Sequence, residues 1–276
     1  MAIIYRPQGE AGEYAHLAIN HIVGCSHGCQ YCYANKMARQ FGNPDFFTVQ
    51  TIKENVIEHL EIETLAYAGT DERVLLCFSC DPYQPIEDET QITRQVIKIL
   101  KENRIPFQVL TKGGMRAARD FDLYGPDDAV AVTMTMLNEK SSLLLEPFAA
   151  VPAERIETLK MAHEKGITTW VSLEPVLDAD VSLRIIKETF EFVDHYKIGM
   201  LNYQKSDINW RKFGEMAIDL CRKAKRSYYI KKGLAKFLDG IPFYSVDTRK
   251  VHKEQSAQEH NQMMTTPRCG GQGVLF

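Results

Sequence analysis

An alternation of short apolar stretches with amphipathic stretches restricts the fold of this chain more than any other feature. The apolar stretches predict buried strands, which we expect at residues 16–23, 73–79, 107–111, 129–136, 168–173 and 193–201, with a last short strand at 227–230. Apolar residues at helical spacing predict helices at 35–40, 51–68, 91–103, 115–121, 152–165, 181–191 and 210–224. Such repeats imply right-handed crossovers and a parallel sheet with helices outside it.

The alternation leaves two α/β architectures open, a doubly wound sheet and a barrel. A chain of 276 residues of which 45% are hydrophobic can bury one large core. We expect an irregular lead-in at 1–14 and one domain at 15–239. Residues 240–276 are polar and weakly patterned, and we interpret them as a tail or a lid over the mouth of the domain.

Composition excludes several classes of protein. The sequence contains no apolar run of about 18 residues, so we expect no membrane helix. The first 14 residues lack the pattern of a secretion signal, and export is not supported. The seven cysteines are odd in number and three are crowded together, which argues against a disulfide framework. We therefore expect a reducing, cytoplasmic location.

Three cysteines, Cys25, Cys29 and Cys32, are spaced C-x3-C-x2-C after the first predicted strand. Thiolates bind soft metals and iron–sulfur clusters. A complete zinc or 4Fe–4S site has four protein ligands, so a cluster held by three cysteines leaves one iron open to a small molecule. Two alternatives remain: a zinc site completed by His21, His27 or a distant cysteine, and a group of thiols packed in the core.

The cysteine motif is followed by an aromatic residue and ends a first strand, as in radical S-adenosylmethionine (SAM) enzymes, which it resembles. The sequences DPYQP at 81–85 and LTK at 110–112 look like the branch related to spore photoproduct lyase, and the resemblance covers roughly residues 15–235. It implies a partial (β/α)6 barrel with a short C-terminal extension. It also implies a 4Fe–4S cluster, SAM as a second cofactor, a 5'-deoxyadenosyl radical, and a reductant of the flavodoxin or ferredoxin type.

The same resemblance implies contacts to SAM at the ends of the predicted strands. Ser79 or Asp81 would accept hydrogen bonds from the SAM amino group. Lys112 would pair with the SAM carboxylate, and the Thr135 hydroxyl would bind the carboxylate or the ribose. Glu174 would contact the ribose or the substrate. Without the resemblance, the segment with Ser79 and Asp81 is also typical of a turn. Lys112 could then be a solvated lysine, and Thr135 could be an ordinary strand residue.

Cys80 and Tyr33 are predicted to be catalytic. Spore photoproduct lyase returns a hydrogen atom through a cysteine after its second strand and a tyrosine next to its third cluster cysteine, and these two residues lie in similar places. The sequence around Cys80 differs from that of the lyase. Cys77 is interpreted as a small core residue, and Cys221 and Cys269 stand alone in the sequence.

The region from Lys205 to Lys253 is basic, with 13 Lys and Arg against 5 Asp and Glu, although the whole chain has a net charge of −3. Basic residues interleaved with aromatic ones can bind phosphates and stack bases, whereas the simpler interpretation is a solvated helix face. The basic region favours a nucleotide or nucleic-acid base as the substrate, and a peptide or a small metabolite stays open as an alternative. The alternatives from other classes are a zinc-stabilised nucleic-acid-binding protein without catalysis and a regulatory protein that binds SAM without turnover.

Overall fold

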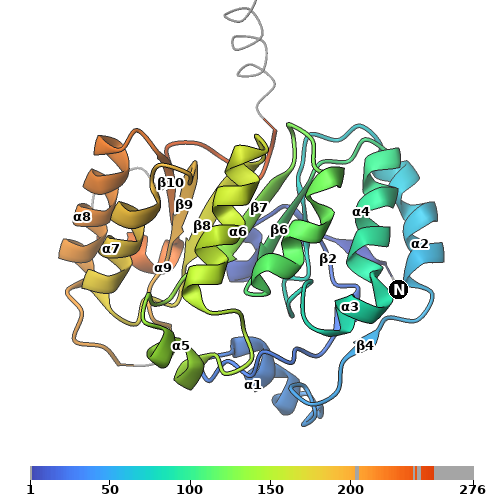
Figure 1. The fold of residues 1–276 in the computed structure, drawn as a ribbon, viewed down its shortest axis with the longest axis horizontal. Coiled ribbons are helices and arrows are strands. Elements are labelled where there is room, and N and C mark those ends of the chain that lie inside the picture. The colour runs from blue at the N-terminus through green and yellow to red at the C-terminus, as the bar shows by residue number, and fades with distance from the viewer. Residues whose placement is uncertain (1, 203–204, 239, 241–243, 252–276) are drawn as a thin grey trace, which may run out of the picture.

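The fold of the computed structural model is built on one parallel sheet (Figure 1). Residues 2–202, 205–238, 240 and 244–251 are described. The main sheet has eight strands in the order β1-β2-β5-β6-β7-β8-β9-β10. β1 runs antiparallel to β2, and the other neighbours pair in parallel. The strands are Ile4–Tyr5, Leu17–Ile19, Val74–Leu76, Phe107–Thr111, Ala129–Thr133, Thr168–Leu173, His195–Ile198 and Ser227–Ile230.

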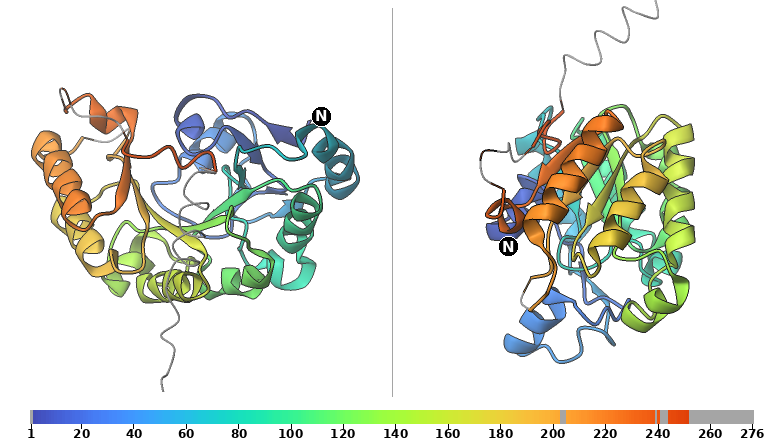
Figure 2. Two further views of the ribbon diagram at one scale, coloured as in Figure 1. Left: turned by 90° about the horizontal axis from the view of Figure 1, so that it is seen from above. Right: turned by 90° about the vertical axis from the view of Figure 1, so that its left-hand side faces the viewer.

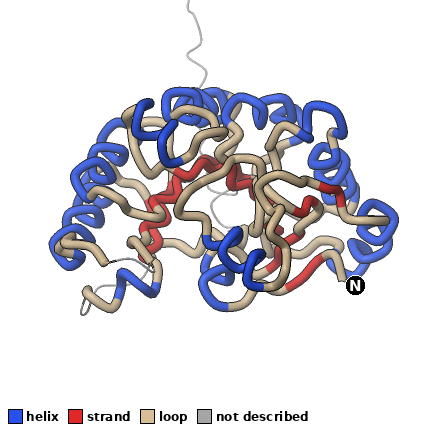
Figure 3. The backbone as a smooth tube through the Cα atoms, turned by 90° about the horizontal axis from the view of Figure 1, so that it is seen from below, coloured by secondary structure: helices blue, strands red, loops and turns tan. Residues whose placement is uncertain are grey.

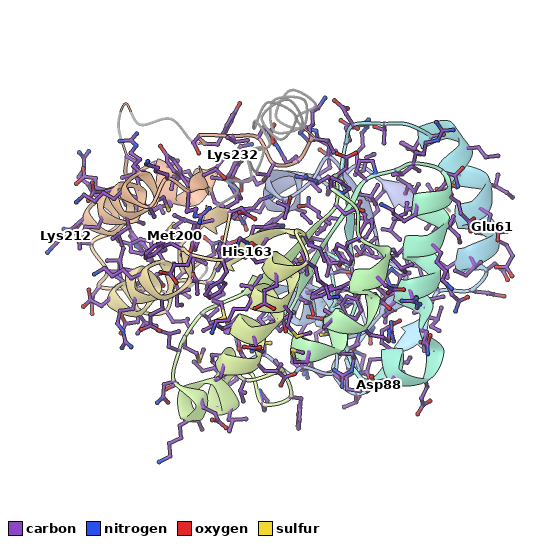
Figure 4. All side chains as sticks on the ribbon, turned by 45° about the horizontal axis from the view of Figure 1, so that its top comes forward. Glu61, Asp88, His163, Met200, Lys212 and Lys232 are labelled. Carbon is purple, nitrogen blue, oxygen red and sulfur yellow. The ribbon has the colours of Figure 1, made fainter. Side chains whose placement is uncertain are left out.

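Helices cover the convex side of the sheet, and the strands form an arc inside them (Figures 2 and 3). They are α2 (Val56–Glu63), α4 (Ile92–Glu102), the 3-10 helix η3 (Gly114–Leu123), α6 (Pro152–Glu164), α7 (Ala179–Thr189) and α8 (Trp210–Lys223). α2 and α8 lie at the two ends of the arc, where Glu61 and Lys212 are exposed (Figure 4). The convex face of the sheet is thereby removed from water, as parallel sheets require.

The carboxyl ends of the strands carry shorter elements that form one rim of the molecule. They are α1 (Tyr33–Gln40), α3 (Ile86–Thr90), α5 (Glu139–Leu145), α9 (Lys232–Ala235) and a small antiparallel sheet of β3 (Ile22–Val23) and β4 (Thr51–Ile52). α1 and α5 lie at the bottom of Figure 1. Functional side chains of parallel α/β proteins gather at this end of the strands.

The lead-in, predicted to be irregular, contributes two elements. Its β1 forms one edge of the sheet, and the 3-10 helix η1 (Gly9–Glu13) reaches toward the opposite edge. There the Glu13 carboxylate accepts hydrogen bonds from the Lys232 backbone N–H at 2.7 Å and the Tyr229 hydroxyl at 3.3 Å. Residues 9–14 therefore span the space between the two edges of the arc.

The predicted α/β fold with a parallel sheet is confirmed, and two further local predictions were wrong. The strand predicted at 16–23 is split into β2 and β3. The helix predicted at 51–68 begins at Val56, because Thr51–Ile52 pairs with β3, and it continues as the 3-10 helix η2 (Thr64–Tyr67). The helix predicted at 115–121 is confirmed and has the 3-10 form, whereas α5 was not predicted.

The described part of the C-terminal segment lies at the amino ends of the strands. The Ser245 N–H bonds Tyr228 O at 3.0 Å, and the Arg73 N–H bonds Arg249 O at 2.9 Å. This is the end opposite α1 and α5 (Figure 1). The predicted lid falls mostly on 252–276, outside the described residues, as does Cys269. No described helix is long and apolar enough to cross a membrane.

Candidate active site

The cysteine loop begins at Gly24, directly after β3. Gly24 has a φ of 84°, and a Cβ atom there would lie 2.1 Å from Val49 O, so no other residue fits without a backbone shift. The next residue, Cys25, donates its N–H to Phe46 O at 2.8 Å. At the other end of the loop, Cys32 caps α1, because its sulfur accepts the Asn35 N–H at 3.4 Å. Backbone geometry thus fixes both ends of the loop.

Loops from two other strands hold the middle of the cysteine loop. Gln84, after β5, accepts the Ser26 N–H at 2.9 Å and donates to Gly24 O at 3.0 Å. On the other side, Gln30 donates its backbone N–H to Leu145 O at 2.9 Å. Gln84 belongs to the DPYQP segment, and its role was missed in the sequence because a buried amide has no local signature.

The three cysteine thiols are not arranged for one metal ion. In the described part of the chain, no three His, Cys, Asp or Glu side chains are grouped so that they could hold a single ion. A zinc ion needs every thiolate sulfur about 2.3 Å from itself, whereas each cysteine of a 4Fe–4S cluster binds a different iron, so the sulfurs stand further apart. Three thiols on one loop are the number of ligands with which a 4Fe–4S cluster keeps one iron open.

The two histidines that could have completed a zinc site have other neighbours. His27 Nδ1 lies 3.5 Å from an Asp81 oxygen, and His21 Nδ1 lies 3.4 Å from the Cys77 sulfur.

Burial raises the pKa of the Cys25 thiol to about 12 and that of Cys29 to about 11. A thiol must lose its proton to become a metal ligand, so metal binding would release protons from these cysteines.

Asp81 lies beside the cysteine loop, and both of its carboxylate oxygens accept hydrogen bonds. One carboxylate oxygen accepts the Thr111 hydroxyl at 2.6 Å and the Tyr83 N–H at 2.9 Å. The other accepts the Lys112 N–H at 2.6 Å. These hydrogen bonds hold together the two strand ends that carry the DPYQP and LTK segments, so Asp81 fixes the position of Lys112.

A buried charge network extends from Lys112 to the loop after β7. The Lys112 ammonium lies 5.6 Å from the centre of the Tyr31 ring, and the Tyr31 hydroxyl donates to Glu146. Glu146 also accepts the Thr135 hydroxyl at 3.0 Å and forms an ion pair with Arg155. Burial lowers the pKa of Lys112, but Cys29 and Glu146 outweigh it, and the pKa is raised. Lys112 is therefore a cation beside the cysteine loop.

Glu146 and Arg155 form an ion pair that links two elements of the fold. Both side chains are almost completely buried. Arg155 also donates to Ala150 O at 2.7 Å and to Thr133 O at 3.0 Å. It thereby fastens β7 to the start of α6. The Thr135 hydroxyl is linked to this ion pair because it donates a hydrogen bond to Glu146.

Glu174, at the end of β8, belongs to a second group of polar side chains. One of its oxygens accepts the Asn202 amide at 3.1 Å. The other accepts the Tyr14 hydroxyl at 2.8 Å and pairs with Lys231. Tyr14 and Lys231 were missed in the sequence, because they lie 160 and 57 residues from Glu174.

The predicted catalytic residues lie near one another. The Tyr33 hydroxyl donates to Phe78 O at 3.0 Å, which places its ring against the loop that carries Cys80. Cys80 is half-buried, and its thiol donates to Ile22 O at 3.2 Å. In the same loop, the Ser79 backbone N–H bonds Asn20 Oδ1 at 3.2 Å.

Many side chains of the basic region are used in ion pairs. The pairs are Arg211–Glu215, Lys223–Asp219, Arg226–Asp194, Lys231–Glu174, Arg249–Asp247 and Lys250–Asp71. This pattern favours the interpretation of the region as an ordinary charged surface.

Comparisons with known proteins agree with this fold. A structure of spore photoproduct lyase complexed with dinucleoside spore photoproduct superposes with a TM-score of 0.59, 13% identity, and coverage of 96% of this chain and 75% of that chain. SuiB of Streptococcus suis bound to S-adenosylmethionine gives a TM-score of 0.60, 12% identity, and coverage of 82% and 51%. At these identities the likeness shows the fold.

Sequence relatives include two uncharacterized proteins. One, from Methanocaldococcus jannaschii, is 28% identical over 70% of this chain and 73% of its own length. The other, from Mycobacterium tuberculosis, is 29% identical over 58% of this chain and 49% of its own length, so the matched part is about half of that relative. The family model of the radical SAM superfamily matches residues 19–193. The chain belongs to the radical SAM superfamily and is an enzyme.

Proposed function

We propose that Cys25, Cys29 and Cys32 hold a 4Fe–4S cluster and that SAM binds beside it. Together these groups would supply a 5'-deoxyadenosyl radical that abstracts a hydrogen atom from the substrate. The observation that carries the proposal is the donor set, which presents three thiols on one loop whose two ends are fixed by backbone geometry. An oxygen-sensitive cluster would fit the predicted reducing, cytoplasmic location.

The protein's own residues would bind and orient SAM. Lys112 offers a cation to the SAM carboxylate, and Asp81 keeps that lysine in place through its backbone. Ser79 lies in the loop between Cys77 and Asp81 and is available to the amino group. Thr135 is tied to Glu146, so its role would be to shape the pocket wall. Glu174 would exchange one of its present partners for a hydroxyl of the ribose or the substrate.

The reductant is proposed to be an acidic electron carrier of the flavodoxin or ferredoxin type. Several apolar side chains beside the cysteine loop are strongly exposed, namely Met37, Phe41, Leu144 and Phe148. Exposed Arg39 and Lys140 accompany them on α1 and α5. An apolar patch with basic neighbours is complementary to an acidic partner. Charge reversal in Arg39→Glu should slow reduction by such a carrier at low salt, while reduction by dithionite stays unchanged.

The proposed substrate is a nucleotide or nucleic-acid base. The similar lyase structure contains a dinucleoside photoproduct, which supports a base-sized pocket in this fold. Phosphate contacts would come from cations such as Lys212, Lys225 and Lys236, which are exposed. Because so many other basic residues are paired, we expect a single nucleotide or short segment rather than a long duplex.

The decisive experiment is anaerobic reconstitution with iron and sulfide, followed by dithionite and SAM. Wild-type protein should become brown and release 5'-deoxyadenosine, detected by mass spectrometry. Cys29→Ala should lose both properties. The matched control is Cys221→Ala, which removes a buried cysteine of α8 far from the loop along the chain and should keep both. A colourless protein that binds zinc tightly would overturn the proposal and favour the non-catalytic alternative. An iron-loaded protein that binds SAM without releasing 5'-deoxyadenosine would favour the regulatory alternative.

A further inference from the structure

An apolar groove runs along α2, at the end of the arc where the N-terminus lies (Figure 1). It has a volume of about 510 Å³, and its apolar lining residues are Ala2, Ile4, Ile62, Ala66 and Tyr67. The Ile62 side chain is 69% exposed, and so is that of Leu65 in the adjoining 3-10 helix η2. Contiguous apolar side chains that are exposed beside a groove mark an interaction site.

The edge strand beside this groove is closed to pairing with a further strand. The Glu63 carboxylate accepts hydrogen bonds from the backbone N–H groups of Ile3 and Ile4, each at 2.9 Å. A strand that joins a sheet needs the free N–H groups of an edge. The groove is therefore suited to apolar side chains rather than to strand addition, which argues against edge-to-edge pairing of two copies of this chain.

The last described residue of the chain lies close to the groove. Val251 donates its N–H to Asp71 O at 2.9 Å. Asp71 follows Tyr67 of the groove by four residues, and the turn between them is closed by a hydrogen bond from the Thr70 N–H to Tyr67 O at 3.0 Å. Because four residues span at most about 15 Å, Val251 lies near the end of the groove that Tyr67 forms.

The part of the chain that follows Val251 contains one markedly apolar stretch. Residues 252–273 are mostly polar, whereas 274–276 are Val-Leu-Phe. The 22 residues between Val251 and this stretch can span roughly 75 Å when extended, so the stretch can reach the whole groove. Attachment to the same chain raises its effective concentration there, so a few apolar contacts are sufficient for binding.

We propose that Val274, Leu275 and Phe276 bind in the groove along α2 of their own chain. Their side chains cover Ile62 and the apolar walls of the groove, which removes apolar surface on both sides from water. The segment is thereby held on the outer face of the protein and leaves the rim with the cysteine loop open. This contact does not depend on a cluster or on SAM, because the cysteine loop lies at the other end of the strands.

Photo-crosslinking of the full chain locates the segment. After irradiation of the variant Phe276→p-benzoylphenylalanine, mass spectrometry of the tryptic digest should find residue 276 linked to the peptide of residues 54–73, which contains Ile62 and Tyr67. In a mixture of unlabelled and 15N-labelled protein, each linked pair should carry a single isotope, because the contact lies within one chain.

Two other results of this experiment would overturn the proposal. A link to the peptide of residues 141–155, which contains α5, would place the segment over the rim as a lid. Linked pairs of mixed isotope would show that a second copy of the chain fills the groove.

A pair of substitutions in the same photoreactive chain tests the groove itself. Ile62→Asp places a charge in the groove and should reduce the yield of the link to residues 54–73 at least several-fold. Because the Ile62 side chain is largely exposed, the fold should be unchanged. The matched control is Met216→Asp on α8, where the side chain is 41% exposed at the other end of the arc, and it should keep the link. Equal yields in the two variants would contradict binding in this groove.

Discussion

Two buried ion pairs at the carboxyl end of the sheet are built in different ways. Glu146 pairs with Arg155 where the side chains are 0% and 1% exposed, whereas Glu174 pairs with Lys231 where they are 14% and 4% exposed. Arg155 binds two backbone carbonyls as well as its carboxylate. A guanidinium remains charged and its planar fork fixes geometry, whereas a lysine is a flexible point charge.

This difference makes the pair of Glu146 and Arg155 structural, whereas the pair of Glu174 and Lys231 can rearrange. Glu146 and Arg155 are almost completely buried, so a ligand has no access to this ion pair. Glu174 is held by Tyr14, Asn202 and Lys231 through side chains that can rotate, so a ligand can replace one of them. Burial and the type of cation, rather than the presence of a carboxylate at a strand end, therefore distinguish the candidate binding residue.

The largest expected effect comes from breaking the structural pair. Arg155→Ala should lower the free energy of unfolding by about 3–5 kcal/mol, because it leaves the Glu146 carboxylate buried without its partner. Urea unfolding of the reduced protein without cluster measures the loss. The double variant Arg155→Met with Glu146→Leu should recover most of it, since an apolar pair leaves no unpaired charge. A double variant as unstable as the single one would show that the network matters for more than this pair.

Lys231→Met should cost less, about 1–3 kcal/mol, because the Glu174 carboxylate is partly exposed and keeps the Tyr14 and Asn202 hydrogen bonds. It should also weaken SAM or substrate binding in the loaded enzyme, which Arg184→Ala in an exposed ion pair of α7 should not do. Isothermal titration of SAM under anaerobic conditions, beside urea unfolding, separates the two effects. Loss of stability with unchanged affinity for both SAM and substrate would make this pair as structural as the first.

The elements that could be predicted from the sequence are those defined by local patterns. The strands and most outer helices follow from hydrophobic periodicity, and the place of the cysteine loop follows from Gly24 after an apolar stretch. The 3-10 form of η3 and the pairing of β4 with β3 depend on tertiary contacts, which periodicity does not contain. Local patterns therefore predict where the rim lies, but not the form of elements that depend on tertiary contacts.

Residues of the candidate site could be predicted only where they lie in short sequence motifs. Asp81 and Lys112 were singled out from short motifs, and the structure adds that the carboxylate binds the lysine's backbone. Tyr14 and Lys231 had no signal, because their link to Glu174 exists only after the chain has closed the arc. His21 was considered as a zinc ligand, and the structure places its ring beside Cys77, with Nδ1 and Nε2 at 3.4 and 3.6 Å from the sulfur.

A third ion pair, Asp247–Arg249, lies at the opposite end of the sheet. We expect it to have the smallest effect on the free energy of unfolding. Burial would raise the pKa of Asp247, but the hydrogen bonds and charge of Arg249 outweigh it and lower the pKa from 3.8 to about 2. A carboxyl group whose pKa is lower in the folded than in the unfolded protein stabilises the fold at pH values above its unfolded pKa. This contribution disappears as the pH falls from about 4 to about 2. Because the pair is partly exposed, we expect a contribution of about 1 kcal/mol.

Urea unfolding at pH 5 and pH 2.5 measures this contribution. Wild-type protein should lose about 1 kcal/mol more than Asp247→Asn between the two pH values, and the other carboxyl groups cancel in the difference. Equal losses would show that this pair contributes nothing measurable. A difference as large as that of Arg155→Ala would mean that burial does not rank the ion pairs of this protein, and the distinction between Glu146 and Glu174 would then need another physical basis.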